Sequence, residues 1–91
     1  MSSPSADVSD AKRVIRNRII AMADRRRIDA RGLKDNDVIP ETGVLDSAGI
    51  LELVIWVEMT FGVTIDQSDL TLDNFGTIDA MVSYLRRAKS N

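Results

Sequence analysis

The architecture of this chain follows from one stretch of sequence, Gly43-Val44-Leu45-Asp46-Ser47-Ala48-Gly49-Ile50-Leu51-Glu52-Leu53-Val54. Aspartate and serine are preferred helix caps, so the Asp46-Ser47 pair predicts a helix that begins there. Gly62 is well placed to end this helix after Phe61, because glycine tolerates the left-handed conformation of a C-terminal cap. The helix has a predicted core face at Ile50, Leu53, Val54, Val57 and Phe61.

One further long helix is predicted on each side of this stretch. The first begins after a cap at Ser9 or Asp10 and ends near Arg25 to Arg27, and the last begins after a cap at Thr77. Both show apolar residues at helical spacing, which predicts that each turns one face toward a core. These residues are Ala11, Ile15, Ile19 and Met22 in the first helix and Ile78, Met81, Val82 and Leu85 in the last.

The segments between these helices are less regular. Residues 28–46 keep no helical or strand period, which predicts a long loop. Residues 67–74 predict a short turn or helix built around Leu70, Leu72 and Phe75. We therefore expect an all-α fold: a small four-helix bundle of three main helices and one short helix, with a long loop between helices 1 and 2. Residues 1–9 are expected to form a flexible tail, residues 10–88 the domain and residues 89–91 a C-terminal tail.

Composition limits what the chain can do. A length of 91 residues allows one domain, and the absence of His and Cys excludes Ser-His-Asp and Cys-His catalysis, the usual zinc sites and disulfides. We therefore do not expect an enzyme. No apolar run is long enough for a membrane span and the N-terminus lacks the features of a secretory signal, so a cytoplasmic location is the expectation. We also expect a monomer.

Charge is divided unevenly along the chain. Residues 1–34 carry nine basic and four acidic residues, whereas residues 35–91 carry three basic and ten acidic residues. The acidic part is expected to present a negative surface that favours basic protein partners and disfavours nucleic acid. The basic first helix, which includes Arg25-Arg26-Arg27, is interpreted as a solvated face rather than a nucleic-acid patch, because no aromatic residues are interleaved with its cations.

Ser47 has two interpretations. On cap statistics alone, Asp46-Ser47 is simply the start of a helix. However, Ser47, Leu51, Ile55 and Met59 are four residues apart and line the side of the helix roughly opposite its core face. Glu52 and Glu58 flank this apolar strip, which is the composition of a protein docking surface. We expect partner contacts at Ala48, Leu51, Glu52, Ile55, Glu58 and Met59.

The stretch around Ser47 resembles the attachment motif of acyl and peptidyl carrier proteins, in which a serine after an aspartate begins the second helix. The resemblance extends through Glu52 and Leu53 to the Phe75-Gly76-Thr77-Ile78 entry into the last helix. It implies that Ser47 bears covalent 4'-phosphopantetheine and that Asp46 helps to place a metal ion and orient the site. Ala48, Gly49, Met59 and Thr60 differ from general fatty-acid carriers, and the chain looks more like the stand-alone carriers of specialised pathways.

This resemblance also implies a function and a set of partners. The chain would hold acyl or aminoacyl groups as thioesters and present them to other enzymes. Its partners would be a phosphopantetheinyl transferase, an adenylating acyl or aminoacyl ligase, and a ketosynthase or other acyltransferase. Two alternatives remain: an unmodified helical adaptor that binds a protein through the apolar strip, and a small nucleic-acid-binding domain. Trp56 is interpreted as a core residue, with a cargo or partner contact as its alternative.

Overall fold

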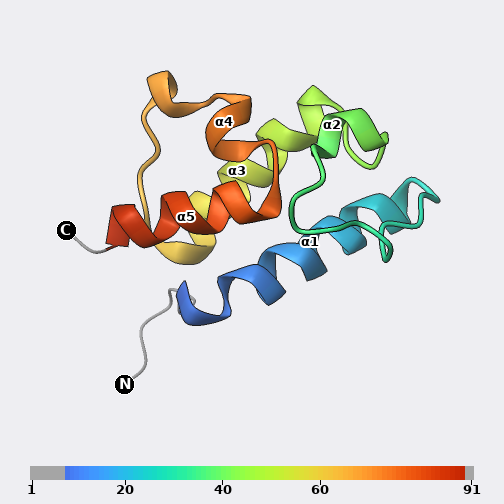
Figure 1. Ribbon diagram of the computed structural model, residues 1–91, viewed down its shortest axis with the longest axis horizontal. Coiled ribbons are helices and arrows are strands. Elements are labelled where there is room, and N and C mark those ends of the chain that lie inside the picture. The colour runs from blue at the N-terminus through green and yellow to red at the C-terminus, as the bar shows by residue number, and fades with distance from the viewer. Residues whose placement is uncertain (1–7, 90–91) are drawn as a thin grey trace.

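The architecture is a bundle of helices, described for residues 8–89 in a computed structural model (Figure 1). Residues 8–89 contain no β-strand, which confirms the predicted all-α class. The predicted tails at residues 1–7 and 90–91 lie outside the described residues. In chain order the elements are η1 (Val8–Asp10), α1 (Ala11–Arg25), α2 (Ile39–Thr42), α3 (Ser47–Phe61), η2 (Gln67–Asp69), α4 (Leu72–Phe75) and α5 (Ile78–Lys89).

Regular structure extends slightly past both ends of the predicted domain, residues 10–88. Val8 and Ser9 belong to a 3-10 turn that leads into α1, and Val8 packs against the core. At the other end Lys89 is the last residue of α5, and its ammonium group donates a hydrogen bond to the carbonyl of Phe61 at 2.9 Å. Val8 and Lys89 thus contact the folded part of the chain, while the domain bounds themselves stay a prediction.

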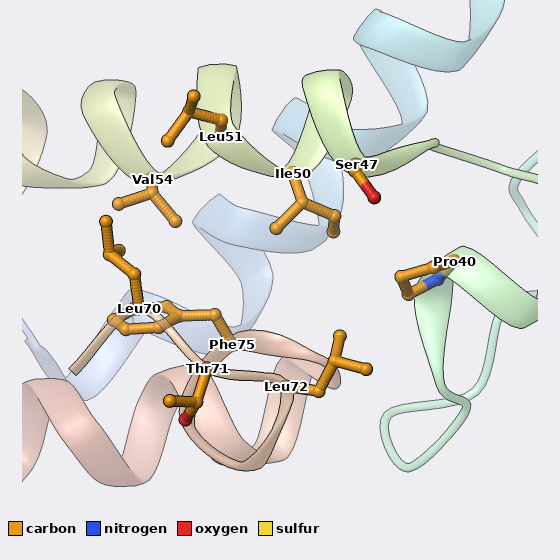
Figure 2. A pocket seen from close by; sticks show the side chains of 9 residues that line it. All are labelled: Pro40, Ser47, Ile50, Leu51, Val54, Leu70, Thr71, Leu72 and Phe75. Atoms are coloured by element: carbon orange, nitrogen blue, oxygen red, sulfur yellow. The ribbon is translucent and has the colours of Figure 1, made fainter. Parts of the chain in front are cut away.

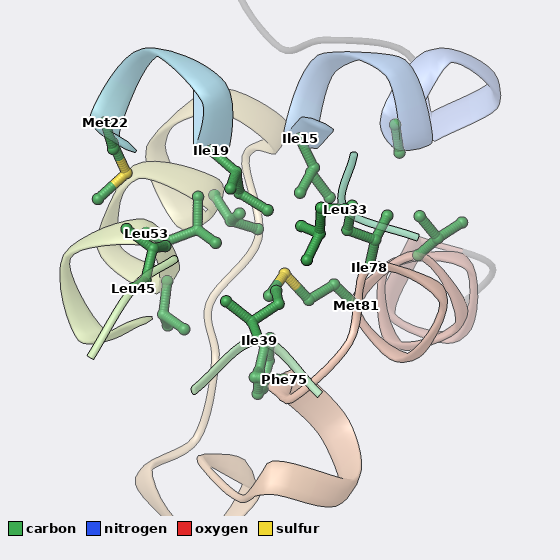
Figure 3. Packing of buried hydrophobic residues seen from close by; sticks show 14 of the residues in the cluster. Ile15, Ile19, Met22, Leu33, Ile39, Leu45, Leu53, Phe75, Ile78 and Met81 are labelled. Carbon is green, nitrogen blue, oxygen red and sulfur yellow. The ribbon is translucent and has the colours of Figure 1, made fainter. Parts of the chain in front are cut away.

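The core lies between α1, α3 and α5, with α4 and the loop residues completing it (Figure 3). The stripes predicted for the first and last helices are buried, as are Leu53, Val54, Val57 and Phe61 of α3. Ile50 was also predicted for this face, but it is only partly buried, at the edge of the core. Burying a side chain of this size contributes about 1.5–3 kcal/mol, so these contacts hold the three long helices together.

The long loop between α1 and α3 is not wholly irregular. It contains α2, a single helical turn with Pro40 in its first turn, where the missing N–H of proline has no cost. The sequence predicted no helix here, because four residues are too few to show a helical period. The Ile39 N–H donates to the Gly76 carbonyl at 2.8 Å, and the Asp79 N–H donates to the Asp35 carbonyl at 3.0 Å. These bonds fix the loop to the start of α5.

Helix ends follow the predicted caps in most places. Gly62 has a φ of 67° and ends α3 in the left-handed conformation, and Thr77 caps α5 by accepting a hydrogen bond from the Ala80 N–H at 2.9 Å. The exception is Asp10, whose side chain makes no cap hydrogen bond and instead pairs with Arg13 at 3.3 Å. The preceding η1 turn leads directly into α1, so the helix starts without that cap.

The segment around residues 67–74 forms two short elements instead of one. The turn η2 is followed by α4. Thr71 caps the start of α4 by accepting a hydrogen bond from the Asn74 N–H at 3.3 Å. Of the apolar residues expected here, Phe75 is buried, whereas Leu70 and Leu72 remain 38% and 60% exposed. The two leucines therefore contribute little to the core and are available at the surface beside α3.

Candidate functional site

Ser47 is the first residue of α3, and its side chain is exposed. Asp46 precedes it in an extended conformation, and one of its carboxylate oxygens accepts a hydrogen bond from the Gly49 N–H at 2.8 Å. The first N–H groups of a helix have no partners within the helix and form the positive end of its dipole. The predicted cap is thus confirmed, and it leaves the Ser47 hydroxyl outside the capping interaction.

The Asp46 carboxyl is held in its charged form. The hydrogen bond from the Gly49 N–H, with a smaller contribution from Arg26, lowers the pKa of Asp46 below its ordinary value. Arg26 lies 3.6 Å from the carboxylate. Gly49 suits this geometry, because a Cβ at that position would lie only 3.1 Å from the Cβ of Leu45. Asp46 therefore presents a fixed negative charge beside the serine.

An apolar pocket of about 270 Å³ opens next to Ser47 (Figure 2). Ser47 itself forms part of the lining, and in the figure its hydroxyl is directed to the side of α3 on which Pro40 lies. The other lining residues come from α2, α3 and the α4 region: Pro40, Ile50, Leu51, Val54, Leu70, Thr71, Leu72 and Phe75. No residue of this lining is charged. The sequence did not predict this pocket, and its one visible signal was the pair of leucines, Leu70 and Leu72, in an otherwise polar segment.

The apolar strip on α3 lies at the surface beside this pocket. Leu51, Ile55 and Met59 are 51%, 52% and 77% exposed, and Ala48 is exposed as well. Leu51 belongs both to the strip and to the pocket lining. Large apolar side chains that stay exposed together on one face of a small domain are typical of an interaction surface.

The acidic border of the strip is engaged within the chain. One carboxylate oxygen of Glu58 accepts a hydrogen bond from the Ile65 N–H at 2.7 Å, which fixes the segment after α3. Glu52 lies 3.8 Å from Arg25 of α1 and remains largely exposed. The sequence predicted both glutamates as partner contacts, and this stays a prediction. The structure adds that Glu58 helps to hold the segment after α3 and that Glu52 faces a cation of α1.

The cations of α1 also have partners within the chain. Lys12 lies 3.3 Å from both Asp35 and Asp79, and Arg16 pairs with Asp35. Together with the Arg25–Glu52 and Arg26–Asp46 pairs, these contacts set the basic helix against the acidic half of the chain. The negative surface expected from the sequence is therefore reduced, and so is the basic patch that a nucleic-acid-binding domain would need.

Trp56 contributes to the core rather than to the pocket. It is partly buried, packs against the core and meets Phe61 edge-on with 6.3 Å between the ring centres. The guanidinium of Arg18 lies 5.3 Å from the centre of the Trp56 ring, at cation–π distance. This environment agrees with the core interpretation of Trp56.

Within residues 8–89, no cluster of three or more His, Cys, Asp or Glu side chains could hold a metal ion. In the same part of the chain, no helix is long and apolar enough to cross a membrane.

Comparison with known proteins shows the family to which the chain belongs. The family model for the phosphopantetheine attachment site matches residues 19–85. The chain belongs to this carrier-protein family. It is also 32% identical, over 69 residues, to the D-alanyl carrier proteins of Streptococcus pyogenes serotype M5 (strain Manfredo), serotype M49 (strain NZ131) and serotype M1. Each match covers 75% of this chain and 86% of the relative.

Family membership gives the prosthetic group of this carrier protein, covalently attached 4'-phosphopantetheine. The described residues fit such a group. An exposed hydroxyl stands at the N-terminus of a 15-residue helix, and its surroundings leave room on the pocket side. The carrier domain therefore offers an accessible serine where the positive end of a helix dipole favours the charge of a phosphodiester.

Proposed function

We propose that this carrier protein bears its phosphopantetheine on Ser47, holds acyl or aminoacyl groups on the terminal thiol as thioesters, and presents them to partner enzymes. The exposure of Ser47 at the start of α3, beside both a pocket and an apolar strip, is the observation that carries this proposal. The chain contains no His or Cys, so chemistry on the cargo belongs to the partners and the carrier is not an enzyme.

Attachment of the arm is a phosphoryl transfer from coenzyme A. The Ser47 oxygen attacks the phosphorus next to pantetheine, the P–O–P bridge breaks, and adenosine 3',5'-bisphosphate leaves. The serine proton passes to a base of the phosphopantetheinyl transferase, which also brings magnesium. The resulting phosphodiester lies at the α3 N-terminus, where a negative charge is stabilised by about 0.3–1 kcal/mol. We assign Asp46 a second role in this step, as a carboxylate that helps to place the transferase's metal ion.

Partner enzymes contact the carrier through the strip on α3. Leu51, Ile55 and Met59 form its apolar centre, and the small Ala48 lies at the end nearest Ser47. Glu52 is the more exposed of the two glutamates at its edge. The interaction therefore depends more on apolar burial than on ion pairs. The partner classes are a phosphopantetheinyl transferase, an adenylating acyl or aminoacyl ligase, and a ketosynthase or other acyltransferase of a specialised biosynthetic pathway. Similarity to proteins named D-alanyl carrier proteins supports the role of a carrier.

An unmodified adaptor would use the same exposed strip, and the Ser47 hydroxyl distinguishes the two functions. The test is intact mass after incubation of the protein with coenzyme A, magnesium and a promiscuous phosphopantetheinyl transferase. Ser47→Ala removes the acceptor, and Ser83→Ala removes an exposed serine on α5 as the matched control. We expect a gain of one phosphopantetheine on the wild type and on Ser83→Ala, and none on Ser47→Ala. A folded wild type that gains nothing, while a known carrier is modified, would favour the adaptor.

A further inference from the structure

Two negative charges meet at the root of the arm. Attachment of phosphopantetheine adds the charge of a phosphodiester to Ser47, directly beside the Asp46 carboxylate. Asp46 stays charged, because the Gly49 N–H donates to it at 2.8 Å and lowers its pKa. The positive end of the α3 dipole amounts to only about half an elementary charge. The loaded carrier therefore favours a further cation at this end of α3.

The cation within ion-pair distance of this site is Arg26, at the C-terminal end of α1. One of its guanidinium nitrogens lies 3.6 Å from the Asp46 carboxylate. Residues 35–85 contain no Lys or Arg, so the elements on the other sides of the site supply no alternative. The preceding Arg25 faces Glu52 at 3.8 Å, further along α3. Arg26 is thus the cation best placed to meet a phosphate on the serine.

The contact between Arg26 and Asp46 leaves the guanidinium available to a second anion. A separation of 3.6 Å exceeds the usual length of a hydrogen bond, and it involves the carboxylate oxygen that the Gly49 N–H does not use. The backbone of Arg26 is fixed by its N–H bond to the Ala23 carbonyl at 2.9 Å, while its side chain is 52% exposed. A guanidinium binds phosphate oxygens through paired donors. Arg26 can therefore turn toward a phosphate without disturbing the end of α1 or the cap of α3.

We propose that Arg26 binds the phosphodiester on Ser47, so that phosphate, guanidinium and the Asp46 carboxylate form one charge cluster at the start of α3. The proposal rests on attachment at Ser47 and adds a residue of α1 to the site. Arg26 holds the root of the arm, while the thiol end stays free to reach partner enzymes. Attachment of the arm then also ties α1 to α3, because residues of both helices contact the phosphate.

A thermodynamic cycle measures this contact. The full chain is prepared with and without the arm, as wild type, Arg26→Gln and Arg25→Gln, and intact mass verifies loading. Arg25 is the matched control, because it ends the same helix but faces Glu52. In a domain of 91 residues, one exposed ion pair shifts the unfolding midpoint by about 2–4 °C. At low salt, we expect the midpoint change on attachment to be less favourable by this amount in Arg26→Gln than in the wild type and unaltered in Arg25→Gln. High salt is expected to reduce the difference.

NMR of the wild-type protein gives a second readout that needs no variant. The side-chain Nε–Hε signal of Arg26 is expected to shift when the arm is attached, whereas that of Arg25 is expected to stay in place. Equal midpoint changes in all three proteins, an equal loss in both arginine variants, or an unmoved Arg26 signal would overturn the proposal. A protein that is loaded on Ser47 but shows no such coupling contradicts only the role of Arg26, whereas a protein that cannot be loaded contradicts the proposed function.

Discussion

A carboxylate oxygen of Asp46 accepts a hydrogen bond from the Gly49 N–H at 2.8 Å, directly beside the exposed Ser47. The same carboxylate thus caps α3 and places a negative charge at the proposed attachment site. These two roles depend on different properties of the side chain, since an amide oxygen can also accept the capping hydrogen bond but carries no charge.

Substitution of Asp46 separates the cap from the charge. Asp46→Asn is expected to lower the thermal unfolding midpoint less than Asp46→Ala does, because Asn keeps the capping acceptor and loses only the charge. Both variants are expected to slow phosphopantetheine transfer. Thermal unfolding by circular dichroism and the rate of mass gain measure the two effects. A normal transfer rate in Asp46→Asn would reduce Asp46 to a helix cap.

Glu58 is expected to stabilise the fold more than Glu52 does. Glu58→Ala removes the acceptor for the Ile65 N–H, and a hydrogen bond to a charged group contributes about 1.5–3 kcal/mol to the free energy of unfolding. Glu52→Ala breaks an exposed ion pair with Arg25, which contributes at most about 1 kcal/mol. Urea unfolding of both variants provides the comparison. Equal losses would contradict the structural role of Glu58.

Acid is expected to weaken the attachment of the long loop to α1. The hydrogen bond from Arg16, with further contributions from Lys12, lowers the pKa of Asp35. A carboxyl whose pKa is lower in the folded state stabilises the fold fully above its unfolded pKa of about 3.9, and that contribution is lost as pH falls through the lowered value. Unfolding midpoints measured from pH 7 to pH 2 are expected to fall less below pH 4 in Asp35→Asn than in the wild type. Identical profiles would show that the contacts of Asp35 with Arg16 and Lys12 do not stabilise the fold.

The centre of the α3 strip is expected to affect docking without affecting folding. Ile55 is 52% exposed, so Ile55→Ser removes an apolar contact for a partner while leaving the core intact. The KM for the carrier in the transferase reaction is expected to rise several-fold, with little change in the unfolding midpoint. The salt dependence of this KM is expected to be weak, because the flanking glutamates are engaged within the chain. A steep salt dependence would indicate that ion pairs dominate the interaction.

Local sequence signals predicted the ends of α3 and much of the core. Asp46 and Gly62 mark the bounds of α3, because a cap acts through neighbouring backbone groups and is visible in the sequence itself. Helical spacing likewise identified the buried residues of α1 and α5. The turn α2 was missed, since four residues cannot show a helical period and its position depends on the distant Gly76 carbonyl.

The remainder of the site depends on tertiary structure. The pocket brings together Pro40, Val54 and Leu72, which lie in three separate parts of the chain, so no local pattern could predict it. The partners of the two glutamates on α3 could not be predicted from the sequence for the same reason. Glu58 is engaged by an N–H seven residues away, and Glu52 by an arginine of the first helix. The sequence predicted which residues lie at the surface of α3, but not which of them make hydrogen bonds or ion pairs within the chain.

Localisation of the phosphopantetheine within the chain tests the central claim most directly. Cleavage after glutamate gives the peptide of residues 42–52, in which Ser47 is the single serine, and separates it from Ser68 and Ser83. Tandem mass spectrometry of the fully modified protein is expected to place one phosphopantetheine on this peptide, at Ser47. Modification of any other peptide, or none on residues 42–52 of a folded protein beside a carrier control that is modified, would contradict the account.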